Sequence, residues 1–80
     1  MFRLSRGYRL LSRKRVPEAI AILKLNVEAY PNSANVYDSL GEAYFVSGNT
    51  AQAIQNYEKS LSLDPANTNA AMMLKKLKNQ

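Results

Sequence analysis

Apolar residues recur with helical spacing in the middle of the chain, and helix-ending residues separate the apolar stretches. Along residues 34–47, the large apolar side chains fall on one side of a helix. Gly48 can take a positive φ angle and predicts the end of this helix. Asn49, with Gln52 three residues later, predicts the N-cap of a second helix that runs to about Leu63. No alternating run and no Asn-Gly turn favours a strand.

Prolines set the limits of the other helices. A residue before proline disfavours helical geometry, so Pro31 and Pro65 each predict a helix end just upstream. Pro17 fits the first turn of a helix over residues 16–29. Further helices are predicted over residues 2–12 and 67–78. The chain is therefore expected to be all-α, with five antiparallel helices joined by short turns.

The sequence repeats itself with a period of 34 residues. Among the 46 residue pairs that this shift superposes, seven are identical. Several of these identities involve Gly, Ala or Pro, whose backbone and size roles are hard to replace. The identical pairs are Ser5/Ser39, Gly7/Gly41, Ala19/Ala53, Ile20/Ile54, Pro31/Pro65, Asn35/Asn69 and Leu40/Leu74. The period predicts stacked helical repeats, in which each helix pair covers its neighbour.

The second repeat resembles the tetratricopeptide repeat (TPR). The matching residues are Tyr37-x-x-Leu40-Gly41-x-x-Tyr44, then Ala53, Tyr57 and Pro65. The resemblance implies helix-turn-helix repeats stacked as a short right-handed α-solenoid. It also implies a scaffold that binds other proteins and has no catalytic activity.

The resemblance divides the chain into three parts within a single domain, residues 1–80. Residues 34–67 form the well-matched repeat, and residues 68–80 resemble a capping helix that closes the array. Residues 1–33 form a degenerate first repeat. This first unit departs from the family pattern at Arg3 and Arg6, where an aromatic residue and a leucine are usual. The docking of the first helix is therefore left open.

Charge is distributed unevenly along the chain. The net charge is +5, yet residues 1–15 hold six basic and no acidic residues, whereas residues 16–64 hold two basic and six acidic residues. Basic ends and an acidic centre speak against one continuous nucleic-acid footprint. The Arg-rich start also fits a mitochondrial transit peptide, a weaker alternative to the repeat. No apolar run is long enough for a membrane span. The cytoplasm is the expected compartment, although the absence of Cys fits either redox environment.

Catalysis, metal binding and cofactor binding have little support. The chain has no His and no Cys, which removes nucleophile–imidazole pairs and common zinc sites. Its three glycines are scattered and form no phosphate-binding loop. Asp38 and Glu42 lie four residues apart on one helix face, and two solvated acids explain them better than a catalytic pair. We expect no enzyme activity, no metal site and no cofactor.

A binding groove is the function that the resemblance implies, because the first helix of each repeat lines the concave side of a TPR array. The expected groove residues are Asn35, Asp38, Ser39, Glu42 and Phe45. Their acidic character predicts a basic or amphipathic peptide or partner protein. Phe45 would supply contact area and Asn35 a hydrogen bond to the peptide backbone. The corresponding positions lack the cations of TPRs that grip a C-terminal carboxylate, so that ligand is not expected.

Two alternatives stay open beside the groove. A basic patch near the N-terminus could contact RNA or an anionic membrane through phosphate neutralisation, although nucleic acid is the less favoured partner. Its residues are Arg6, Arg9, Arg13, Lys14 and Arg15. The other alternative is a self-associating module, domain-swapped or otherwise, because two repeats are fewer than the three usually needed for stability. The sequence names neither the partner nor the oligomeric state, and the chain could be a fragment of a larger protein.

Overall fold

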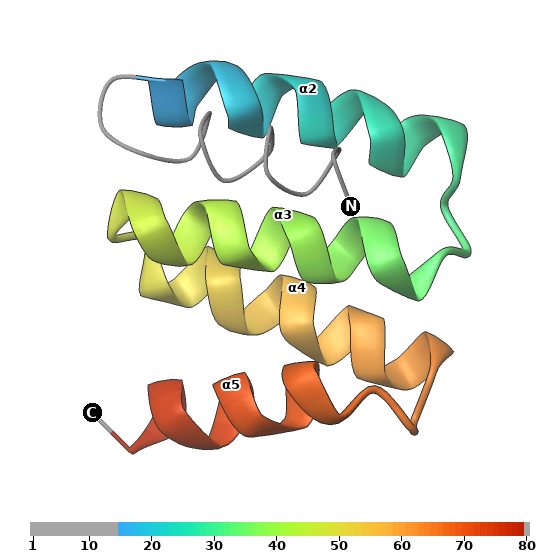
Figure 1. Ribbon diagram of the computed structural model, residues 1–80, viewed down its shortest axis with the longest axis vertical. Coiled ribbons are helices and arrows are strands. Elements are labelled where there is room, and N and C mark those ends of the chain that lie inside the picture. The colour runs from blue at the N-terminus through green and yellow to red at the C-terminus, as the bar shows by residue number, and fades with distance from the viewer. Residues whose placement is uncertain (1–14, 80) are drawn as a thin grey trace.

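Four helices make up the part of the chain that the computed structural model describes, residues 15–79 (Figure 1). They are α2 (Val16–Ala29), α3 (Ala34–Ser47), α4 (Thr50–Leu63) and α5 (Thr68–Lys78). No strand occurs between residues 15 and 79. The all-α prediction is confirmed, and the helix limits agree with those expected. The helix predicted over residues 2–12 lies outside the described residues.

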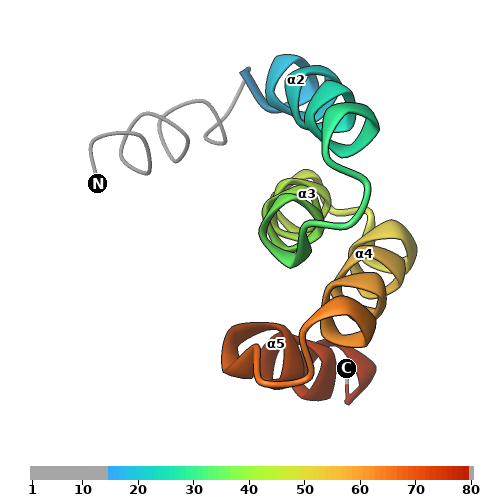
Figure 2. The ribbon, with the colours of Figure 1, turned by 90° about the vertical axis from the view of Figure 1, so that its right-hand side faces the viewer.

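The helices form a short stack. Figure 2 shows α3 and α5 on one side of the stack and α4 on the other, with α2 above α3 at the end of the stack. Each helix packs on the next one along the chain and runs antiparallel to it, with α2 at one end of the described stack and α5 at the other (Figure 1). Short turns after each helix force this arrangement, since a chain reversal of two to four residues places consecutive helices side by side.

The core lies between α3, α4 and α5. Its buried apolar residues are Ala53, Tyr57, Ala70, Leu74 and Leu77. Tyr57 is only 1% exposed, and its ring fills the space over Gly41, where an added Cβ would meet three ring carbons at 3.1–3.2 Å. A residue without a side chain is therefore required at position 41 for this close contact. Ala19 of α2 and Ala43 of α3 form a second, smaller cluster.

The helix ends follow the signals in the sequence. Gly48 ends α3 with φ of +89°, a conformation that glycine adopts without steric cost. The Asn49 side chain caps α4 by accepting a hydrogen bond from the Gln52 N–H at 3.2 Å. No helix among the described residues is long and apolar enough to cross a membrane.

Candidate partner-binding face

The five predicted groove residues all lie on α3, but their surroundings differ. Asn35 and Ser39 are exposed, whereas Asp38, Glu42 and Phe45 are half-buried. Phe45 packs against the core between α4 and α5, so only part of its ring remains available to a partner. The site therefore contains both exposed side chains and side chains that also pack within the fold.

The Asp38 carboxylate is held by two asparagines. The Asn67 side-chain amide donates to Asp38 Oδ2 at 2.9 Å. The Asn69 amide donates to both carboxylate oxygens, at 2.9 Å to Oδ1 and 3.2 Å to Oδ2. Hydrogen bonds to an ionised group are stronger than neutral ones, so these contacts fix the start of α5 against α3.

Asn67 links three parts of the stack. Besides Asp38, its amide donates to Ser60 Oγ of α4 at 2.9 Å, and its Oδ1 accepts from the Ala70 N–H, which caps α5. The fully buried Ser60 hydroxyl in turn donates to the Ala34 carbonyl oxygen at 2.8 Å, at the start of α3. We call this network of Ala34, Asp38, Ser60, Asn67 and Asn69 the polar junction. The polar junction provides hydrogen-bond partners for the buried Ser60 hydroxyl, which would destabilise the fold if it had none.

The polar junction was not predicted from the sequence. The cap itself has a recognisable signal, because Asn67 precedes an apolar helix. The contact between Asn67 and Asp38 joins residues 29 positions apart, and no local pattern indicates such a pair. Only the packed arrangement of α3, α4 and α5 brings these side chains together.

Glu42 sits one turn after Asp38 on the same side of α3. Partial burial raises the pKa of the Glu42 carboxyl, and the nearby Asp38 charge raises this pKa further. No lysine or arginine in the described part of the chain forms an ion pair with Glu42. The ionised form of Glu42 is therefore less stable than that of a fully exposed glutamate, and a cation brought by a partner would stabilise it.

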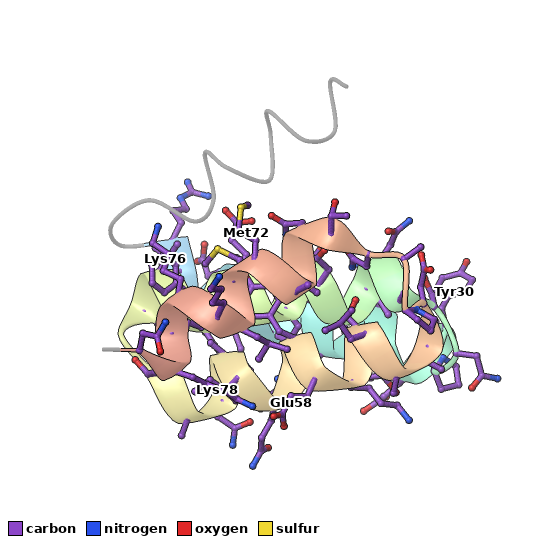
Figure 3. All side chains as sticks on the ribbon, turned by 90° about the horizontal axis from the view of Figure 1, so that it is seen from below. Tyr30, Glu58, Met72, Lys76 and Lys78 are labelled. Carbon is purple, nitrogen blue, oxygen red and sulfur yellow. The ribbon has the colours of Figure 1, made fainter. Side chains whose placement is uncertain are left out.

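Two residues of α5 extend this surface, and sequence reasoning did not assign them to it. Met72 is 60% exposed and Lys76 is also exposed. Figure 3 shows both projecting from the side of α5 that points away from α4, whereas Lys78 turns to Glu58 of α4 and pairs with it at 2.8 Å. The combined surface, here called the α3–α5 face, consists of Asn35, Asp38, Ser39, Glu42, Phe45, Asn69, Met72 and Lys76.

The basic patch falls mostly outside the described residues. Arg6, Arg9, Arg13 and Lys14 are not described. Arg15 is exposed, and its guanidinium lies 3.6 Å from a Glu18 carboxylate oxygen. Both side chains remain largely open to solvent, so this ion pair is weak.

Metal-ligating side chains do not gather in the described residues, where no group of three or more His, Cys, Asp or Glu could hold an ion. The Asp38–Glu42 pair has the two carboxyls of a hydrolytic site, yet Asp38 is engaged by Asn67 and Asn69. The geometry thus favours recognition through hydrogen bonds, charge and apolar area.

Comparison with known families decides the identity of the helix pair α3–α4. The family model described as tetratricopeptide repeat matches residues 34–67. The match begins at the first residue of α3 and includes the turn that follows α4. Residues 34–67 are a tetratricopeptide repeat. Gly41 beneath Tyr57 is the close contact between the two helices of this TPR.

Several known proteins contain a segment similar to this TPR chain. The Hsp70-Hsp90 organizing protein of Triticum aestivum is 40% identical over 63 residues, which cover 79% of this chain and 11% of that protein. Cellulose synthase operon protein C of Escherichia coli strain K12 is 40% identical over 52 residues, 65% of this chain and 4% of that protein. Superkiller complex protein 3 of Mus musculus is 34% identical over 65 residues, 81% of this chain and 4% of that protein.

The chain thus spans only a small part of each of these relatives. Each of them is similar to this chain over a segment of 52 to 65 residues. The predicted membership of the TPR family is confirmed, and with it a module of the protein–protein interaction class.

Proposed function

We propose that the α3–α5 face binds a basic or amphipathic segment of a partner protein. The observation that carries this proposal is the Asp38–Glu42 pair, in which a half-buried Glu42 has its pKa raised and forms no ion pair with a cation among residues 15–79. A Lys or Arg side chain of a partner placed there would relieve the repulsion between the two acids. Met72 offers apolar contact area on the same face.

The polar junction supports this role by holding the face in place before a partner arrives. Asn67 and Asn69 fix the Asp38 carboxylate, and they also fix α5 relative to α3. A prearranged surface loses less conformational entropy on binding than a mobile one. Asn35 and Ser39, which are exposed, would donate or accept hydrogen bonds at the rim.

The names of the relatives agree with a binding role. The Triticum relative is named as an organizing protein, and the Mus relative as part of a complex. We infer that this chain likewise acts by binding and not by catalysis. Its partner is not carried over from those proteins, because the α3–α5 face is acidic on α3 and has only Lys76 as a cation on α5.

Fluorescence anisotropy with labelled peptides tests the proposal. We expect basic amphipathic peptides to bind more tightly than acidic peptides of the same length, with affinity falling as salt screens the charges. Glu42→Gln should weaken binding of the basic peptide about threefold to tenfold, the range for one partly desolvated charge pair. Glu58→Gln, which removes an acid from α4 outside the face, should leave the affinity unchanged. Tighter binding of the acidic peptide would contradict the proposal.

A further inference from the structure

Helix α2 is apolar on two opposite sides. Val16 and Ala19 are buried on the side that meets the rest of the stack. On the opposite side, Ile22 is 50% exposed and Leu25 is 62% exposed. These two residues are three positions apart and therefore adjacent on the helix surface. A second apolar surface on one short helix indicates a contact that residues 15–79 do not themselves provide.

The second repeat acts as an internal control for this observation. A shift of 34 residues superposes α2 on α4 and matches Ile22 with Asn56 and Leu25 with Lys59. The positions that are apolar in α2 are thus polar in α4, where the Lys59 ammonium lies 5.8 Å from the centre of the Tyr37 ring. The repeat fold does not require apolar residues at these positions.

Acidic residues border the apolar side of α2. Glu18 precedes Ile22 by four residues and Glu28 follows Leu25 by three, so both lie on the same side. Both are exposed, and within residues 15–79 the ion-pair partner of Glu18 is Arg15, in the weak pair described above. We call Glu18, Ile22, Leu25 and Glu28 the α2 outer face.

The other end of the stack carries the complementary surface. On α5, Ala70, Leu74 and Leu77 face the core, while Met72 and Lys75 lie on the opposite side and are exposed. We call Met72 and Lys75, with Lys76 beside them, the α5 outer face. It has an apolar centre and basic neighbours, whereas the α2 outer face has an apolar centre and acidic neighbours. The two faces belong to the first and last helices of the described stack (Figure 1).

We propose that the occupant of the α2 outer face is the α5 outer face of a second copy of this chain. Helix α5 of one copy would stack on α2 of the next, with Met72 against Ile22 and Leu25, and Lys75 near Glu28. The two surfaces differ, so the contact is heterologous and leaves one outer face of each pair available for a further copy. Each face is small, which makes this association weak and dependent on concentration. The contact shares Met72 and Lys76 with the proposed peptide site, whereas Ile22, Leu25, Glu28 and Lys75 lie outside that site. Substitutions at Leu25, Glu28 and Lys75 therefore test the association separately from peptide binding.

Sedimentation velocity of the full chain, from about 10 μM to about 1 mM, tests the inference. We expect the weight-average mass to rise continuously and to pass twice the monomer mass at the highest concentrations. Leu25→Lys should weaken association at least tenfold, because it places a charge in the apolar contact and repels the lysines of α5. Gln55→Lys, which adds the same charge at an exposed position of α4, should change the association constant little. Circular dichroism confirms that both variants stay folded.

A charge-swap pair separates direct contact from indirect effects. Glu28→Lys and Lys75→Glu should each weaken association severalfold, and an equimolar mixture of the two variants should restore it, because opposite charges then meet at every contact. A strictly monomeric mass up to 1 mM, which is the result if residues 1–14 or a different protein cover α2, would overturn the inference. So would a mass that levels off at the dimer, or an association unaffected by Leu25→Lys.

Discussion

Replacing Asn67, the N-cap of α5, by alanine should destabilise the fold more than replacing any polar residue within α5, because Asn67 is the centre of the polar junction. The substitution removes the cap of α5, worth about 1 kcal/mol. It also removes the bond to the half-buried Asp38 carboxylate, worth about 1 kcal/mol after allowance for solvent, and the bond to Ser60 Oγ, worth about 1 kcal/mol. Because these contacts are coupled, the expected loss in the free energy of unfolding is about 2–3 kcal/mol.

Urea unfolding followed by far-UV circular dichroism measures this loss, and thermal unfolding should show a fall in Tm of about 8–20 °C. Asn67→Asp serves as the matched variant. It keeps an oxygen that can cap α5 but loses both donors and places a second carboxylate beside Asp38. Its cost should be largest near pH 7 and should shrink under acidic conditions, where carboxyl groups are protonated.

Asn69→Ala provides the second comparison, because the Asn69 amide donates to Asp38, whereas the cap of α5 and the bond to Ser60 both come from Asn67. It should cost about 0.5–1 kcal/mol. A double-mutant cycle of Asp38→Ala and Asn67→Ala should give a coupling of about 1 kcal/mol. If Asn67→Ala costs no more than Asn69→Ala, or if the cycle is additive, the junction does not hold α5 in the way described.

Two further predictions concern α3. Gly41→Ala should lower the free energy of unfolding by about 1–2 kcal/mol in a urea titration. The added Cβ would lie 3.1 Å from the enclosed Tyr57 ring, and the cost of this crowding exceeds the gain from the better helix propensity of alanine. A more stable variant would show that the ring moves freely. Burial raises the pKa of Glu42, so the folded state binds a proton at this carboxyl more readily than the unfolded state does. Proton binding therefore stabilises the fold below the ordinary carboxyl pKa. This stabilisation is lost as the pH rises through the raised pKa of Glu42. Glu42→Gln should therefore be more stable than the wild type at pH 7, with the difference decreasing towards pH 4; an unchanged difference across this range would contradict the assigned burial.

The helices of this protein could be predicted from the sequence because their signals are local. Gly48, Asn49 and the prolines at 31 and 65 end or begin helices through their own backbone preferences, and the structure places the helix limits there. The repeat period likewise predicted the stacking, since Gly41 and Ala53 are small where two helices must approach.

The candidate site was less predictable because its properties depend on neighbours distant in sequence. Asp38 looks like a free acid on α3, and only the packed structure shows that Asn67 and Asn69 hold it. Met72 appears as one of several apolar residues in a terminal helix, and its exposure depends on how α5 rotates onto the core. Periodicity indicates which side of a helix is buried, but it does not indicate which polar side chains meet across helices.

Binding of a basic or amphipathic peptide to the α3–α5 face can be mapped from the backbone amide shifts of ¹⁵N-labelled protein during a peptide titration. We expect saturable shifts concentrated at Asp38, Ser39 and Glu42 of α3 and around Met72 and Lys76 of α5, with little change on α4. Shifts confined to α2 or α4, with the α3–α5 face unperturbed at saturation, would contradict it.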